Sequence, residues 1–257
     1  MKRYTVALTV CLCIAFPASL RASPQVSPQN QEPKNGAAEH HKKPTKYSAA
    51  PPKGEFQDNQ FVELAPDQDR RVVRENRYKN TYPVITDPAD TSAGPKEDFI
   101  LQISDYAEPL DPFPVARSAA VLIGTVLSGK AFVSKDRTYV YSDYQVHVDQ
   151  VLKQDPSANL AVGDQVVVSR GGGTIHFPSG HIRNYINSGE GYPAVGSQYL
   201  FFLVKPDFPQ AEYEVIIGAA YLLSGGKIHP LDDSQLGQFD NMSESVFMSK
   251  VELAIRS

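Results

Sequence analysis

Cysteine is nearly absent from this 257-residue sequence, and tryptophan is absent altogether. The two cysteines, Cys11 and Cys13, both lie in one apolar segment near the N-terminus. If that segment is removed, the remaining chain has no thiol, which excludes disulfides, thiolate metal sites and a cysteine nucleophile. No second apolar run approaches the roughly 20 residues needed to cross a bilayer. Stability must then come from ordinary burial of apolar side chains.

The signature motifs of common enzyme classes are also missing. The sequence contains no HExxH, GxSxG, GxxxxGK[ST] or strand-linked GxGxxG pattern. The run 170–173 (RGGG) follows an expected strand but has no downstream Lys-Ser/Thr, which favours a flexible turn. Asp232 and Asp233 fit a solvated turn better than a calcium site. The sequence therefore predicts no cofactor, no metal and no catalytic residues.

The first 22 residues have the pattern of an export signal. Lys2 and Arg3 precede an uncharged, mostly apolar run over 4–16, and small residues lead up to Ala22. The run is too short to span a bilayer comfortably, which favours cleavage over anchoring. Cleavage would remove three basic and no acidic residues, lowering the formal charge from −4 to −7. We expect an exported protein, periplasmic or extracellular, that does not insert into the membrane after cleavage and has no broad electrostatic reason to bind nucleic acid.

Composition divides the remaining chain into four parts. Residues 23–60 are rich in Pro, Gln, Lys and Asn without apolar periodicity, which predicts a disordered tail. Residues 61–115 are expected to be a loop-rich lead-in that packs on the next domain, with a short strand near 99–103. Residues 116–232 carry the strand-forming pattern, and 233–257 return to helix. Asn241 is the expected helix cap, with Glu244 in capping-box spacing.

The residues expected on the apolar face of that helix are Phe247, Val251, Ala254 and Ile255. We expect this face to pack on the preceding domain; a helix that binds a partner is the alternative.

The central domain is predicted to be mainly β. Tyr144, Val146 and Val148 alternate with polar residues, as in a strand with one buried face. Other short apolar runs, separated by turn residues, cover 119–126, 165–168, 199–204, 212–217 and 221–228. Many short strands at this spacing are typical of one antiparallel barrel or sandwich.

Four pieces of this pattern carry a resemblance to a known family. They are IGTV at 123–126, VDQVLK at 148–153, VGDQVVV at 162–168 and VGSQYLFFL at 195–203. Their order resembles the OB-fold barrels of the netrin/tissue-inhibitor-of-metalloproteinase type, and uncharacterised exported bacterial proteins with the same arrangement. The resemblance implies a single OB-like antiparallel β-barrel with a C-terminal helix behind the N-terminal tail. The inhibitors' cysteines and inhibitory N-terminal edge are absent, so inhibition is not implied.

The segment 174–186 (TIHFPSGHIRNYI) is the most specific candidate site. A two-residue Ser179-Gly180 turn would place His176 opposite Arg183. That register predicts an apolar face of Ile175, Phe177, Ile182 and Ile186, and a polar face of His176, His181, Arg183 and Tyr185. The following loop could cover the polar face and add Glu190 and Tyr192. The alternatives are an ordinary solvated hairpin face, a site for an anion, sugar or peptide carboxylate, and a metal site without an evident third ligand.

Three functions remain open at this point. We expect a non-enzymatic exported binding or interaction module of the cell envelope or extracellular space, with a protein, peptide or glycan partner. A hydrolase or metal-dependent enzyme with an unrecognised site is the first alternative. A structural envelope-associated protein without a small ligand is the second.

Overall fold

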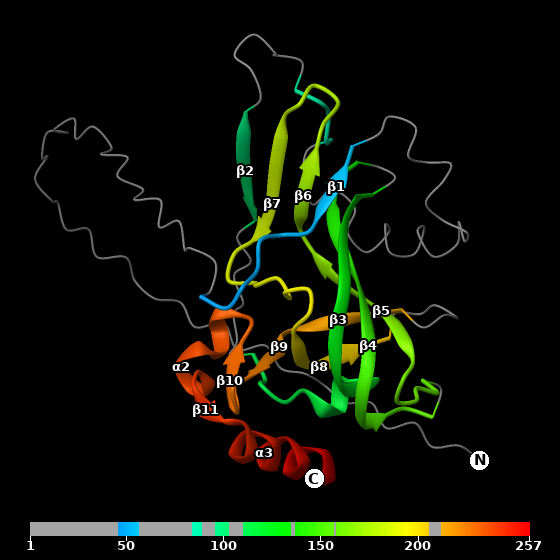
Figure 1. Cartoon of the computed structure of the whole chain (residues 1–257), viewed down its shortest axis with the longest axis vertical. Coiled ribbons are helices and arrows are strands. Elements are labelled where there is room, and N and C mark those ends of the chain that lie inside the picture. The colour runs from blue at the N-terminus through cyan, green and yellow to red at the C-terminus, as the bar shows by residue number, and fades with distance from the viewer. Residues whose placement is uncertain are drawn as a thin grey trace, which may run out of the picture. The chain divides into compact units, whose positions relative to one another are not determined.

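The structure, a computed structural model, describes residues 46–56, 84–88, 96–102, 110–134, 137–156, 158–205 and 212–257. The described chain is mainly β and forms two sheets (Figure 1). Sheet A has the order β1-β6-β7-β2, with strands Lys53–Glu55, Gly173–His176, Ile182–Asn187 and Glu97–Gln102. Sheet B has the order β11-β10-β9-β5-β4-β3-β8, with strands Met242–Ser243, Lys227–Pro230, Glu212–Ser224, Gln165–Gly171, Val140–Gln154, Ala120–Val133 and Gln198–Val204.

Five strands of sheet B form an uneven ring. Besides its pairing with β3, β8 also pairs with β9, so the connections run β3-β4-β5-β9-β8 and return to β3. The β5–β9 pairing is parallel and spans only three residue pairs. The β8–β9 pairing is interrupted by a register shift between Phe201 and Leu203. Gly218, with φ of +79°, lies inside β9 in a backbone conformation that favours glycine.

β3 and β8 are apolar at consecutive positions because both of their faces are covered. One face points into the ring, where Leu122 packs with Phe201. The other face carries Val121 and Phe202 and packs against the C-terminal helix. That helix, α3 (Glu244–Arg256), contributes Phe247 and Val251, while the short η1 (Val115–Arg117), η2 (Asp233–Gln235) and α2 (Leu236–Phe239) lie in the connections around it. The prediction that the helix packs on the β domain is confirmed.

Sheet A packs on the C-terminal end of β3 and the N-terminal end of β4 (Figure 1). Ile175, Phe177 and Tyr185 share a buried cluster with Tyr141 of β4 and Ala131 of β3. β1 lies so close to β3 that a Cβ on Gly54 would come within 2.0 Å of the Ala131 carbonyl oxygen. Only a glycine at position 54 permits the two backbones to come this close. This close approach sets the spacing between the two sheets at β1 and β3.

The predicted strands overlap β2, β3, β4, β5, β8, β9 and β10, and Tyr144, Val146 and Val148 are buried as expected. β3 continues beyond the predicted 119–126 to Val133, and β9 joins the 212–217 run to the start of the 221–228 run. Two expectations were wrong. The expected end of the tail at residue 60 is one of them, because residues 53–55 form β1 and Phe56 is buried in the sheet A cluster; residues 23–45 of the predicted tail lie outside the described residues. Asn241 does not cap the helix, because it adopts φ of +63°, β11 follows it, and Ser243 is the residue before α3.

The predicted signal 1–22, and most of the lead-in 61–115, lie outside the described residues. Among the residues that are described, no helix is long and apolar enough to cross a membrane.

Candidate functional site

The β6–β7 hairpin has a different register from the predicted one. Ile175 lies opposite Arg183, and His176 lies opposite Ile182. The loop contains three residues, since the Phe177 N–H donates to the His181 carbonyl at 2.8 Å and Gly180 adopts φ of +84°. A glycine in this conformation suits a three-residue hairpin loop. Moving the pairing by one residue exchanges which side chains share a face.

The predicted polar face is therefore divided. His176 lies on the face of sheet A that points away from the buried cluster, which we call the outer face. His181, Arg183 and Tyr185 lie on the inner face with Ile175 and Phe177. Tyr185 is fully buried in that cluster. The expected apolar face is also wrong, since Ile182 and Ile186 lie on the outer face.

Asp98 of β2 joins two of the predicted residues into what we call the hairpin-tip cluster: Asp98, His181 and Arg183. Arg183 Nε donates to both Asp98 oxygens, at 2.9 and 3.0 Å. His181 Nε2 lies 3.1 Å from Asp98 Oδ2. The Arg183 guanidinium lies over the Phe177 ring at 5.7 Å, a cation–π geometry. The cluster fastens β2 to the end of the hairpin.

Electrostatics keep the carboxylate of this cluster ionised. Partial burial of Asp98 acts to raise its pKa, but hydrogen bonds from Arg183 and His181 outweigh burial and hold the pKa below its ordinary value. Burial conversely acts to lower the Arg183 pKa, yet the larger effect of the Asp98 hydrogen bond raises it. The Asp98 side chain is 40% exposed, so solvent reaches the ion pair.

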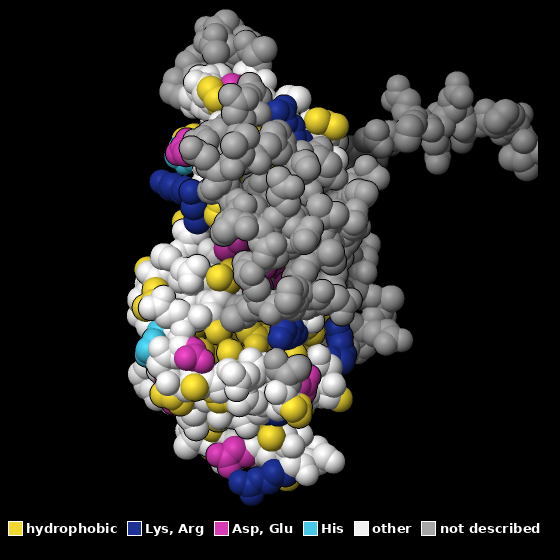
Figure 2. All heavy atoms as spheres, turned by 90° about the vertical axis from the view of Figure 1, so that its right-hand side faces the viewer, with side chains coloured by type: hydrophobic (Ala, Val, Ile, Leu, Met, Phe, Trp, Pro, Cys, Tyr) yellow, Lys and Arg dark blue, Asp and Glu magenta, His cyan; other side chains and the backbone are white. Residues whose placement is uncertain are grey.

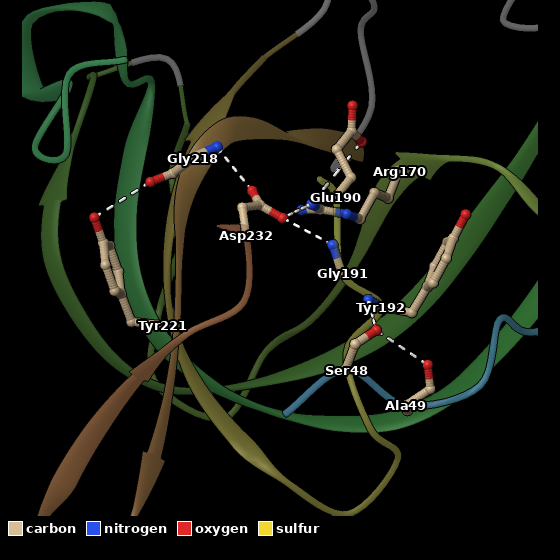
Figure 3. A network of polar contacts seen from close by, with 9 residues as sticks. All are labelled: Ser48, Ala49, Arg170, Glu190, Gly191, Tyr192, Gly218, Tyr221 and Asp232. Atoms are coloured by element: carbon tan, nitrogen blue, oxygen red, sulfur yellow. Dashed lines mark hydrogen bonds and ion pairs between the residues drawn. The ribbon is translucent and has the colours of Figure 1, made fainter. Parts of the chain in front are cut away.

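The two predicted loop residues belong to a different site (Figure 3). Glu190 lies 3.9 Å from Arg170, whose Nη2 donates to Asp232 Oδ1. We call Arg170, Glu190 and Asp232 the buried arginine cluster, because all three are at least nine-tenths buried. The Tyr192 hydroxyl donates to the backbone carbonyl of Tyr185 at 3.0 Å. Tyr192 therefore binds the backbone of β7 and does not cover His181 and Arg183.

Asp232 is the centre of the buried arginine cluster. Besides Arg170, it accepts hydrogen bonds from the backbone N–H groups of Gly191 at 3.0 Å and Gly218 at 2.7 Å (Figure 3). Burial acts to lower the Arg170 pKa, but Asp232 and Glu190 together raise it, so the guanidinium stays charged. The expected solvated turn at Asp232 was wrong. The cluster ties the end of β5 to the loops before β8 and after β10.

Sequence reasoning missed Asp98, Arg170 and Asp232. Arg170 and Asp232 are separated by 62 positions, so no local pattern connects them. Asp98 had no such signal either, because β2 (EDFILQ) groups its charged residues at one end instead of alternating them with apolar ones. In the described part of the chain, no group of three or more His, Cys, Asp or Glu side chains could hold a metal ion. No known family model and no curated protein matches this chain.

Proposed function

We propose that this chain is an exported, non-enzymatic interaction module, built on an OB-like barrel, that binds a polypeptide through the outer face and open edge of sheet A. Export is inferred from the pattern of residues 1–22. The OB-like assignment is supported by the five-strand ring, since OB-folds are five-stranded, partly open Greek-key barrels. The netrin-type resemblance of the strand motifs supports the same assignment.

Sheet A changes which surface of such a barrel is accessible. OB barrels commonly bind ligands over their second and third strands and adjacent loops. Here β6 and β7 are inserted after the third ring strand, β5, and pack on the ends of the first two, β3 and β4. Tyr139, Val140 and Tyr141 are buried under them. Recognition is therefore displaced outward, onto sheet A.

The observation that carries this proposal is the exposure of apolar side chains on an edge strand. Phe99 and Leu101 of β2 are 66% and 39% exposed. They lie beside half-buried Ile182 and Ile186 on the outer face of sheet A. Figure 2 shows the side of the molecule away from β2, where the described acidic and basic side chains are scattered. An exposed edge strand with apolar side chains favours a polypeptide over a glycan, because a second strand can satisfy its backbone groups.

Affinity capture from a cell-envelope extract tests the proposal. The full chain is compared with Phe99→Ser/Leu101→Ser on sheet A, and with Val246→Ser/Leu253→Ser on the exposed side of α3. We expect the sheet A variant to lose captured polypeptides that the wild type and the α3 variant retain. Identical capture profiles for all three proteins would contradict the proposal.

A further inference from the structure

β2 presents backbone hydrogen-bonding groups at an open edge. Within the described ranges it pairs with β7 alone. The N–H of Ile182 donates to the Lys96 carbonyl at 2.9 Å, and the N–H of Ser188 donates to the Gln102 carbonyl at 2.7 Å. Because alternate residues of a parallel strand bond to the same neighbour, the even-numbered residues of β2 face β7. The N–H and C=O groups of Glu97, Phe99 and Leu101 therefore point away from the sheet.

This edge has few of the features that usually prevent pairing. β2 contains no proline, and its register with β7 runs without a bulge over six residues. The inward-pointing Asp98 is paired with the Arg183 guanidinium, and His181 Nε2 lies 3.1 Å from its Oδ2. Natural edge strands are normally protected by prolines, bulges or inward-pointing charges. β2 is thus held in place by the hairpin-tip cluster, and no strand of the described chain pairs with its other side.

We propose that the polypeptide bound at this edge is β2 of a second copy of the chain, paired antiparallel about a two-fold axis at Phe99. This inference rests on the proposed function and specifies its partner. Phe99 then lies opposite Phe99, and Glu97 lies opposite Leu101. All three open residues of each strand exchange both backbone hydrogen bonds, because each lies opposite another open residue. An aromatic cross-strand pair adds to this pairing.

Charge and the number of paired open residues together select this register among the symmetric ones. An axis at Ile100 avoids like charges but leaves Glu97 of each strand opposite a position beyond the end of β2. β2 carries its charged residues at its start, over Lys96, Glu97 and Asp98, and it is uncharged from Phe99 to Gln102. Antiparallel pairing at Phe99 sets the charged half of each strand against the uncharged half of the other. Moving the axis to Asp98 leaves one open residue of each strand unpaired and brings the two Asp98 residues opposite each other. Like charges directly opposite are destabilising.

The size of this interface predicts weak association. One strand pair with Phe99 and Leu101 buries less than the roughly 1,200 Å² typical of stable complexes. We therefore expect a monomer–dimer equilibrium that shifts over about 10–500 µM, as small interfaces do. Sedimentation velocity over this range measures it on the full chain. Phe99→Pro should abolish the dimer, since it removes an outward N–H without removing a bond to β7.

The matched control for self-association is Val195→Glu, at a residue that is 61% exposed outside β2. It should dimerise as the wild type does. Leu101→Glu, which places a second carboxylate directly opposite Glu97 of the other copy, should weaken the dimer. Circular dichroism and thermal unfolding confirm that Phe99→Pro and Leu101→Glu remain folded.

Disulfide trapping tests the register itself. Cys11→Ser and Cys13→Ser remove the chain's own thiols. In the proposed pairing, Phe99→Cys places two Cα atoms about 5.5 Å apart, within disulfide range. Leu101→Cys places them about 15 Å apart, because they are offset by four residues at roughly 3.4 Å per residue on neighbouring strands. Phe99→Cys should therefore form a linked dimer about tenfold faster or more.

The outcomes separate this inference from the proposed function. A chain that stays monomeric at every concentration, or equal trapping at positions 99 and 101, overturns the two-fold pairing. If such a chain still captures envelope polypeptides in a Phe99-dependent manner, the proposed function stands and only the identity of the partner is wrong. A β2-mediated dimer with no such capture supports the inference and limits the interaction to self-association.

Discussion

Removing the Asp232 carboxylate should destabilise the fold strongly. In Asp232→Ala, the buried charge of Arg170 keeps only Glu190, at 3.9 Å, as a carboxylate partner among the described residues. Removing one member of a buried ion pair costs about 3–5 kcal/mol. The N–H groups of Gly191 and Gly218 also lose their acceptor. We therefore expect a loss of about 5 kcal/mol in the free energy of unfolding.

This loss is large enough to measure in two ways. For a domain of this size, about 5 kcal/mol corresponds to a fall in Tm of roughly 10–20 °C. Because the chain has no tryptophan, urea unfolding is followed by circular dichroism or tyrosine fluorescence. The control is Asp155→Ala, which removes a partly exposed ion pair with Lys153 at 3.2 Å and should cost about 1 kcal/mol or less.

A double variant separates charge from packing. Arg170→Met combined with Asp232→Asn removes both charges and keeps an amide oxygen that can accept from a glycine N–H. The double variant should be less destabilised than the sum of its two single variants. Each single variant leaves one charge of the Arg170–Asp232 pair buried without the other, whereas the double variant removes both charges of that pair. The reasoning is refuted if Asp232→Ala unfolds at the same urea concentration as Asp155→Ala.

The remaining predictions concern the core, the hairpin tip and a tight backbone position. Phe201→Ala should cost about 3–5 kcal/mol in urea unfolding, because its side chain is fully buried inside the ring. The Asp98 pair should stabilise the fold above the ordinary carboxyl pKa of 3.8 and lose that effect as pH falls through the lowered value; Asp98→Asn should flatten this acid dependence of Tm. Gly172→Ala should lower Tm, since φ is +83° and a Cβ would come within 2.1 Å of the Tyr192 hydroxyl; an unchanged Tm would contradict the packing there.

The strands could be predicted because their signal is local. Tyr144, Val146 and Val148 alternate with polar residues, and this alternation depends only on which face of one strand is buried. Arg170 and Asp232 could not be predicted in the same way. Their pairing depends on how the end of β5 meets the chain after β10, which is a property of the folded ring.

The predicted end of the tail at residue 60 was wrong for a related reason. Residues 53–55 carry no apolar pattern, and they form a strand only because β6 offers an edge and Gly54 fits against β3. Parallel pairing of such distant segments leaves no trace in the sequence around either one. The buried Phe56 was the one local sign that this segment is held against the fold.

The hairpin register determined where the candidate interaction surface lies. A two-residue loop would have buried Ile182 and Ile186 and exposed Arg183. The three-residue loop turns Tyr185 and Arg183 inward, where Arg183 meets Asp98, and turns both isoleucines outward beside Phe99 and Leu101. The same one-residue shift thus anchors β2 and creates the apolar surface along it. Alternation within the hairpin alone could not reveal this, because the choice of face depends on β2, a strand 80 or so positions earlier.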